Sequence, residues 1–179
     1  MSLHVIDRPI FDPPDARGGL IGDFRSAMRR VASSVTIITG AHQGRRGGLT
    51  ATAVCPVCID PPSLLVCVNR TSKTHGLITG SRRFGVNVLE AGHRDVAETF
   101  AGRTGHDGDD KFVAAGLWED GEASLPMLRE AIAFIACRIV REVVVETHTV
   151  FVGLVEKSVA RSDGLPLLYA DRQFARMAG

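Results

Sequence analysis

Residues 48–74 constrain the fold more than any other part of this chain, because their polarity changes in a fixed order. They read GLTATAVCPVCIDPPSLLVCVNRTSKT. The run 64–68 is apolar without a break, which is typical of a strand covered on both faces. The sequence turns polar at Asn69, and residues 70–74 follow without a carboxylate. We therefore expect a buried strand that ends in a cationic, hydroxyl-rich loop.

This loop has the composition of an anion-binding site. A loop that leads into a helix presents free backbone N–H groups and the positive end of the helix dipole, and both favour a phosphate group. Arg70, Ser72, Lys73 and Thr74 are suitable residue types for binding one. Taken by itself, the loop is explained equally well as a solvated helix cap.

Thr50, Ala51 and Thr52 give a second indication. Two hydroxyl groups flank a methyl-sized side chain on an expected strand, which leaves room for a planar ring to approach the backbone. Taken alone, these residues are also explained by the β propensity of threonine. Together with the cationic loop, they favour a site for a flat ligand that carries a phosphate.

The whole chain predicts a mainly β protein with short helices, an α+β fold. Residues 1–22 are rich in Pro, Gly and Asp and predict an extended N-terminal arm, and residues 23–179 predict one domain. Asp23 is expected to cap a helix. The expected strands are 35–39, 84–88, 131–145 and 147–159, and the expected helices are 24–31, 75–79 and 95–101. A hairpin-like loop at 41–48 and a long polar loop at 102–124, structured only at 111–113, connect them.

Composition limits the partners of the protein. Its 179 residues carry a formal net charge of +1 with only short arginine clusters, so no basic stripe for nucleic acid is present. The N-terminal segment lacks the apolar core of a signal peptide, and no run approaches the ~20 apolar residues that span a bilayer. Rossmann enzymes, P-loop NTPases and α/β-hydrolases are disfavoured because their glycine-rich fingerprints are missing. We expect a cytoplasmic protein that binds neither nucleic acid nor membranes.

Cys55 and Cys58 form a CPVC motif that is open to a thioredoxin-like or a zinc interpretation. Zinc needs a second ligand pair, whereas Cys67 and Cys137 are isolated, and the redox motif normally opens a helix. We therefore expect the pair to be structural, with neither a disulfide nor a metal site. The acidic loop 106–110 does not fit a calcium-binding EF-hand, because the glycine of that motif is missing at the required spacing.

His148 alternates with Val150 and Val152 in the second long β segment. A histidine in such a position is more often a hydrogen-bonded core residue than a catalyst. A catalytic role requires a pocket beside it.

The order and spacing of the motifs resemble the short-chain flavin reductase family, whose members supply reduced flavin to two-component monooxygenases such as the 4-hydroxyphenylacetate type. The resemblance runs from Phe24 to Phe174. Besides residues 48–74, it rests on FGVNVL (84–89), FAG (100–102), Lys111-Phe112, THTVFVG (147–153) and PLLYADRQF (166–174). It implies an FMN-binding split β-barrel, usually a homodimer, with flavin in a groove near the subunit interface.

The resemblance also implies roles for individual residues. The flavin ring would lie along residues 50–52, the phosphate in the loop 69–74, and the nicotinamide near His148. Many relatives have Gly-Asp-His where this chain has Glu146-Thr147-His148. The implied cofactor-binding residues are Thr50, Ala51, Thr52, Asn69, Arg70, Ser72, Thr74, Phe100, Ala101, Gly102, Lys111, Tyr169 and Arg172.

The implied activity is that of an NAD(P)H:flavin oxidoreductase, which passes hydride from nicotinamide C4 to flavin N5 and supplies a separate oxygenase. Two alternatives stay open. The protein could retain FMN and reduce another acceptor, or it could bind flavin without catalysis. The sequence does not choose between FMN and FAD, or between NADH and NADPH.

Overall fold

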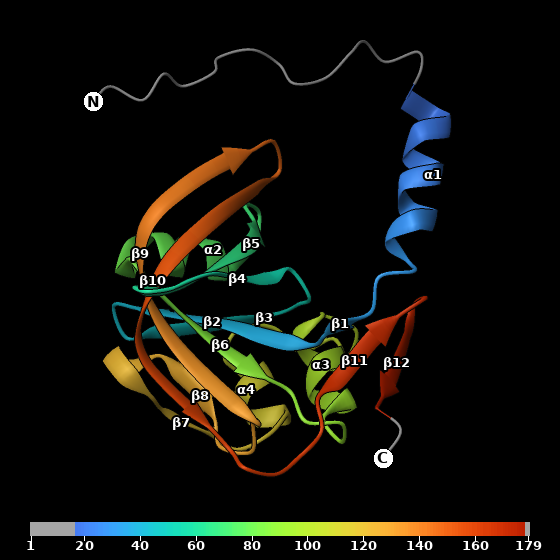
Figure 1. Ribbon diagram of the computed structural model, residues 1–179. Coiled ribbons are helices and arrows are strands. Elements are labelled where there is room, and N and C mark those ends of the chain that lie inside the picture. Colours follow the sequence, from blue (N-terminus) through green and yellow to red (C-terminus); the bar gives the residue numbers. More distant parts are fainter. Residues whose placement is uncertain (1–16, 178–179) are drawn as a thin grey trace, which may run out of the picture.

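A seven-stranded antiparallel sheet forms the body of the protein in the computed structural model, which describes residues 17–177 (Figure 1). Across the sheet, the strand order is β3-β2-β6-β9-β10-β5-β4. In chain order, the strands are β2 (Thr36–His42), β3 (Arg45–Ala51), β4 (Val54–Ile59), β5 (Pro62–Asn69), β6 (Arg83–Val88), β9 (Ala133–Val145) and β10 (His148–Ala160). The two long strands predicted near the C-terminal end are confirmed.

The edge strands of this sheet, β3 and β4, are neighbours in sequence. Only Thr52 and Ala53 separate them, yet no ladder joins these two described strands. The sheet is therefore a barrel that stays split between β3 and β4, which confirms the predicted fold class. Because β3 is paired on one side only, every second residue directs its backbone N–H and C=O groups into the split.

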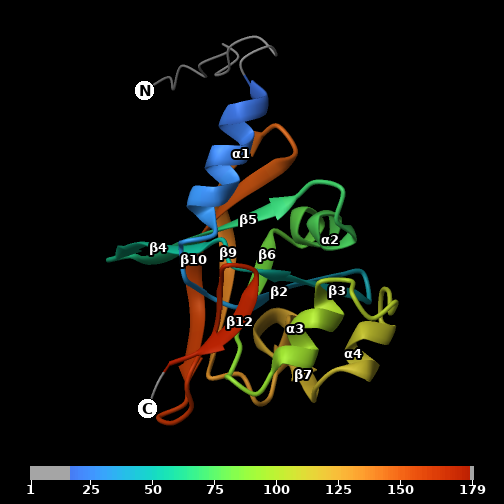
Figure 2. The same ribbon diagram turned by 90° about the vertical axis from the view of Figure 1, so that its right-hand side faces the viewer.

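Shorter elements complete the fold. Figure 2 shows α2 on one face of β2 and β3, with α3 and α4 on the other face, and Figure 1 shows α1 standing apart from the body. A small sheet has the order β1-β11-β12, and β7 pairs with β8. The remaining elements are α1 (Arg17–Met28), β1 (Ser33–Ser34), α2 (Lys73–Ser81), α3 (Arg94–Phe100), α4 (Asp110–Ala114), β7 (Trp118–Asp120), the 3₁₀ helix η2 (Glu122–Ser124), β8 (Pro126–Leu128), β11 (Leu167–Ala170) and β12 (Gln173–Arg176).

Apolar side chains form two main cores, and β2 contributes to both of them. Its neighbouring residues Ile37 and Ile38 point to opposite faces of the sheet, and both are fully buried. The first core includes Ile38, Val66, Ile78, Phe84 and Phe151, and the second includes Ile37, Leu89, Phe100, Phe112 and Leu128. Helix α2 covers the first core, whereas α3 and α4 cover the second.

The sequence predicts that both faces of strand β5 are covered, but in the structure only one face is buried. Leu64, Val66 and Val68 are buried, but the intervening Leu65 and Cys67 are only half-buried. On the neighbouring strand β10, the residues opposite Leu65 and Cys67 are also half-buried. One face of this part of the sheet is therefore apolar and open.

The N-terminal helix begins earlier than the sequence predicts. Residues 17–22 belong to α1 and are not extended, and Asp23 lies inside the helix and does not cap it. The 3-4-3 spacing of Ile21, Phe24, Met28 and Val31 explains this, because the helical period extends N-terminally past Asp23. The rest of the predicted arm, residues 1–16, lies outside the described residues.

Other element boundaries differ by a few residues. Strand β2 continues past Gly40 to His42, so the predicted loop 41–48 shrinks to a turn at Gln43 and Gly44, whose φ angles are 51° and 72°. Helix α2 passes through Gly80 and ends at Ser81, and its C-cap residue Arg82 is left-handed with φ 59°. The structured patch at 111–113 is α4, but β7, η2 and β8 nearby were not predicted. No helix within residues 17–177 is long and apolar enough to cross a membrane.

Candidate functional site

The cationic loop leads into a helix, as the sequence predicts. Ser72 caps α2 with an extended backbone (φ −68°, ψ 135°), and its Oγ accepts a hydrogen bond of 3.2 Å from the Thr74 N–H. The first turn of α2 contains no acidic residue, and Thr74 is buried. The helix end therefore keeps its positive dipole potential, with Arg70 and Lys73 beside it.

Hydrogen bonds join this loop to the first residues of β10. The N–H of Arg70 donates to the carbonyl of Thr147 (2.9 Å), and its guanidinium donates to the carbonyl of Glu146 (3.2 Å). Asn69 lies opposite His148 in the ladder, and its side-chain oxygen accepts from both the N–H and the hydroxyl of Thr71, each at 2.9 Å. Asn69 thus shapes the loop, while the ladder places His148 at its edge.

Alternation along the strand favoured a core position for His148, and this interpretation is wrong, whereas the role near the nicotinamide that the resemblance implies stays a prediction. Its neighbours Thr149 and Phe151 face the core, whereas His148 is exposed on the other face. Its Nδ1 lies 2.9 Å from the hydroxyl of Thr147, so one ring nitrogen is held and the other is free to meet a ligand. Exposure next to the cationic loop fits a binding role better than a packing role.

On β3, the predicted ring-binding residues are partly engaged with the protein itself. Thr50 donates its hydroxyl to the carbonyl of Ala97 on α3 (2.6 Å), and Thr36 donates to the carbonyl of Ala51 (2.8 Å). Thr52 lies at the split between β3 and β4. Thr50 therefore fixes α3 against β3.

The FAG motif lies where α3 ends. Phe100 is 2% exposed, and a Cβ added to Gly48 would lie 2.7 Å from its ring, so this aromatic packs directly on β3. Ala101 and Gly102 are exposed, and Gly102 has a φ of 76°. The buried Phe100 ring thus packs on β3, and it places the exposed residues Ala101 and Gly102 on the same side of the molecule as that strand.

A cleft of about 370 Å³ brings together three predicted residues from distant parts of the chain. Thr52, Tyr169 and Arg172 line it with α1. Arg172 and Asp171 form the turn between β11 and β12 with φ angles of 64° and 45°, and the Asp171 N–H donates to the Arg29 carbonyl at 2.8 Å. Lys111 lies elsewhere, on α4.

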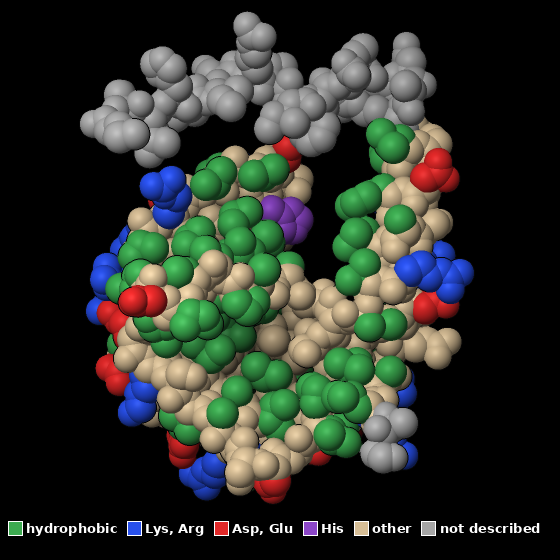
Figure 3. Space-filling model, viewed as in Figure 1, with side chains coloured by type: hydrophobic (Ala, Val, Ile, Leu, Met, Phe, Trp, Pro, Cys, Tyr) green, Lys and Arg blue, Asp and Glu red, His purple; other side chains and the backbone are tan. Residues whose placement is uncertain are grey.

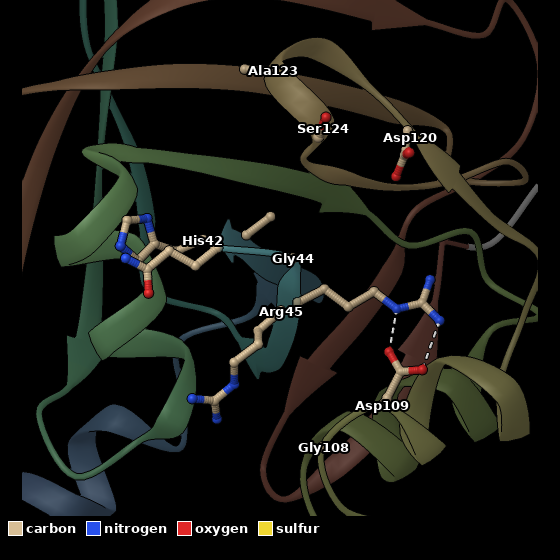
Figure 4. A pocket seen from close by; sticks show the side chains of 11 residues that line it. His42, Gly44, Arg45, Gly108, Asp109, Asp120, Ala123 and Ser124 are labelled. Carbon is tan, nitrogen blue, oxygen red and sulfur yellow. Dashed lines mark hydrogen bonds and ion pairs between the residues drawn. The ribbon is translucent and has the colours of Figure 1, made fainter.

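A larger hollow, of about 830 Å³, lies at the turn between β2 and β3 (Figure 4). Arg46 and Asp109 face each other in it and form an ion pair. None of the residues predicted for the site lines this hollow, and its charges partly neutralise each other. We therefore place the candidate site at the cationic loop and the split rather than here. The other lining residues that Figure 4 labels are His42, Gly44, Arg45, Gly108, Asp120, Ala123 and Ser124.

All four cysteines are free thiols. Cys55 and Cys58 are exposed on the edge strand β4, so the expected structural role does not come from burial. Burial raises the pKa of Cys67, and it raises that of Cys137 to about 12, with a smaller contribution from Glu156. No group of three or more side chains suited to a metal ion occurs in residues 17–177.

His75, which the sequence pattern did not single out, links α2 to the strand that carries His148. Its Nε2 lies 2.9 Å from the Thr149 hydroxyl, and its ring centroid lies 5.4 Å from that of Phe151. Desolvation, and then the charge of Arg70, lower the pKa of His75 below its usual 6.5, while Glu142 opposes the shift. In the sequence, the signal for His75 was its position directly after Thr74 of the cationic loop.

This shift predicts how stability depends on pH. As pH falls below about 6.5, the unfolded chain takes up a proton at His75 that the folded protein accepts only at lower pH, so the wild-type protein loses stability. Urea unfolding at about pH 7.5 and about pH 5.5 should show a smaller acid loss for His75→Gln than for wild type. His106→Gln, in an exposed loop, is the control. An equal acid loss in wild type and His75→Gln would contradict this role.

Comparison with known proteins shows the family of this chain. Residues 28–178 match the family described as "Flavin reductase like domain", and the chain belongs to this family. It is 42% identical over 151 residues to FMN reductase (NADH) RutF 1 of Methylorubrum extorquens, covering 84% of this chain and 74% of that protein. It is 37% identical over 154 residues to the 4-hydroxyphenylacetate 3-monooxygenase reductase component of Pseudomonas aeruginosa, covering 86% of this chain and 90% of that protein.

A solved structure shows the same fold. The Streptomyces globisporus NADH:FAD oxidoreductase SgcE6, in complex with NAD and FAD fragments, superposes with a TM-score of 0.80 and 28% sequence identity. The match covers 94% of this chain and 98% of that chain. The resemblance inferred from the motifs is therefore confirmed, and the chain is a flavin reductase by family.

Proposed function

We propose that this protein transfers hydride from NADH to FMN and releases the reduced flavin to a separate oxygenase component. The observation that carries the proposal is the cationic N-terminal end of α2, tied by Arg70 to the strand that presents His148. Relatives named as an NADH-dependent FMN reductase and as a monooxygenase reductase component support it. FAD and NADPH remain the alternatives for the two substrates.

The donor set at α2 fits a phosphate monoester. Arg70 and Lys73 supply positive charge, while Ser72 and Thr74 supply hydroxyls at a helix end without acids. In the proposal, these residues hold the flavin phosphate, and Asn69 keeps their loop in shape. Arg70 and Lys73 are exposed and Ser72 is half-buried, although Thr74 is buried, and this exposure favours exchange of flavin with solution over permanent retention.

The remaining predicted residues would position the two rings. The open edge of β3 offers backbone N–H groups near Thr50, Ala51 and Thr52, which can stabilise negative charge on the flavin ring. His148 would orient the nicotinamide through its free ring nitrogen. The other members of the proposed site would border the ring or its cleft: Phe100, Ala101, Gly102, Tyr169 and Arg172. Lys111, on α4, lies outside this cleft, and its role stays a prediction.

Bound flavin supplies the hydride acceptor, and the protein supplies alignment. Holding both rings at contact distance removes most of the entropic cost of their meeting, so neither a protein nucleophile nor a general base is needed. In each turnover, one NADH would lose a hydride and become NAD⁺, while one flavin would take up that hydride and a proton from solution and become the two-electron-reduced flavin. NADH oxidation with purified protein should therefore depend on added FMN in a saturable way. Oxidation that ignores added flavin would contradict release of reduced flavin.

We propose, further, that the protein is a homodimer whose subunits exchange apolar contacts. Helix α1 exposes an apolar stripe, with Leu20 67% and Phe24 63% exposed. Figure 3 shows a hollow between α1 and the body of the molecule, with hydrophobic side chains on both walls. The open face of β5 and β10 and the exposed Val143, Val144 and Val145 of β9 offer further apolar surface. A second copy fits because a two-fold axis would bring each α1 to the open sheet of its partner.

The dimer proposal predicts the effect of placing charge on this surface. Phe24→Glu together with Val143→Glu should yield monomers in light scattering, because each buried carboxylate would lose its hydration without gaining a partner. Val113→Glu is the matched control, since Val113 is 79% exposed on α4. A double variant that stays dimeric would contradict this interface.

The proposal includes a cytoplasmic location, which agrees with the four free thiols of the chain.

A further inference from the structure

The loop between α3 and α4 forms ion pairs with Lys73 of the phosphate region and with Arg46 of the neighbouring hollow. Lys73 of α2 donates to the carboxylate of Asp107, and Arg46 of β3 pairs with Asp109. The loop turns at three glycines with positive φ: 76° at Gly102, 78° at Gly105 and 55° at Gly108. It therefore reaches the N-terminal end of α2, where the flavin phosphate is proposed to bind.

The two ion pairs differ in how firmly they are held. Arg46 uses two nitrogens on Asp109, the second at 3.2 Å, and its guanidinium carbon lies 4.5 Å from the centroid of the Phe112 ring. The side chains of Lys73 and Asp107 are 69% and 67% exposed. The Arg46–Asp109 pair therefore anchors the loop, and the Lys73–Asp107 pair is free to open.

Asp107 is built to stay ionised at this position. Its carboxylate accepts from Lys73 and from the N–H of Gly108, the latter at 2.7 Å, and both hydrogen bonds lower its pKa. Because the first turn of α2 has no acid of its own, Asp107 brings to this helix end the negative charge that the helix lacks. The Asp107 carboxylate is thus already paired with Lys73, the cation that an entering phosphate would bind.

We propose, building on the proposed flavin reductase activity, that Asp107 competes with the flavin phosphate for Lys73 and so keeps FMN weakly held and exchangeable. An entering phosphate must break the Lys73–Asp107 pair and then lies near the displaced carboxylate. Both effects subtract from phosphate affinity, whereas riboflavin, which has no phosphate, meets neither. Asp107 therefore sets how strongly the site prefers phosphorylated flavin, which suits an enzyme whose product must leave.

Titrating flavin fluorescence with the full chain tests this directly. Asp107→Asn should lower the Kd for FMN about two- to fivefold at low ionic strength, the range expected for an exposed ion pair, and leave the Kd for riboflavin unchanged. In a Lys73→Gln background, Asp107→Asn should no longer tighten FMN. Asp163→Asn, which loses the exposed pair with Arg161 in another loop, is the matched control and should change neither Kd.

Each other outcome overturns the competition. Unchanged or weaker FMN binding in Asp107→Asn would make the pair a structural contact, and equal tightening of FMN and riboflavin would remove the phosphate from the explanation. Tightening of FMN binding that persists in the Lys73→Gln background would show that Asp107 does not act through Lys73. Failure of the reductase proposal is separate, since it would appear as absent NADH oxidation in the wild-type protein whatever its flavin Kd.

Discussion

Replacing Arg70 and Ser72 together by alanine is expected to raise the Kd for FMN about 100-fold. Each side chain would lose a charge-assisted hydrogen bond to the phosphate, which contributes about 1.5 kcal/mol or more, and 1.4 kcal/mol corresponds to a tenfold change in Kd. Riboflavin binding should change little. Flavin fluorescence titration measures both constants.

The double variant also loses the cap of α2, which costs about 1 kcal/mol of stability, so its folding must be checked by thermal unfolding. Arg129→Ala is a matched control, because Arg129 forms an exposed ion pair with Glu119 away from the loop. FMN affinity that is unchanged in a folded Arg70→Ala/Ser72→Ala protein would show that this loop does not bind the flavin phosphate.

Replacing Phe84 by alanine is expected to destabilise the protein by about 3–5 kcal/mol. The ring of Phe84, on β6, is fully buried, and it packs so closely on Gly153 of β10 that an added Cβ there would lie 2.6 Å from it. Removing it leaves a cavity at the centre of the split barrel. Urea unfolding with an unchanged m-value would report this loss.

Val113→Ala serves as the comparison for this variant. Val113 is 79% exposed, so its truncation should change stability by about 0.5 kcal/mol or less. A Phe84→Ala loss of similar size would show that the first core does not hold the barrel together.

Local sequence predicted the parts of the site that depend on neighbouring residues. The capped helix after residue 69 follows from Ser72 and the apolar strand before it, and both are present. The interpretation of His148 as a core residue was wrong, because alternation along β10 does not reveal whether the second face of the sheet is covered within one chain. The same gap in the pattern explains why Leu65 was expected to be fully buried.

Contacts between distant residues were beyond the sequence. His75 meets Thr149 across 74 positions, and Lys73 meets Asp107 across 34. Neither spacing follows from a helical or strand period, so only the fold brings these groups together. Helix α1 was misjudged for a different reason, since its glycines suggested an extended chain while its apolar spacing indicated a helix.

Anaerobic reduction of FMN tests the central claim most directly. A trace of protein is mixed with NADH and a large molar excess of FMN, and the visible absorbance of oxidised flavin is followed. The proposed function predicts that many equivalents of FMN per protein are bleached, with one NADH oxidised for each. Bleaching no faster than in the protein-free mixture, with FMN or FAD and with NADH or NADPH, would contradict it.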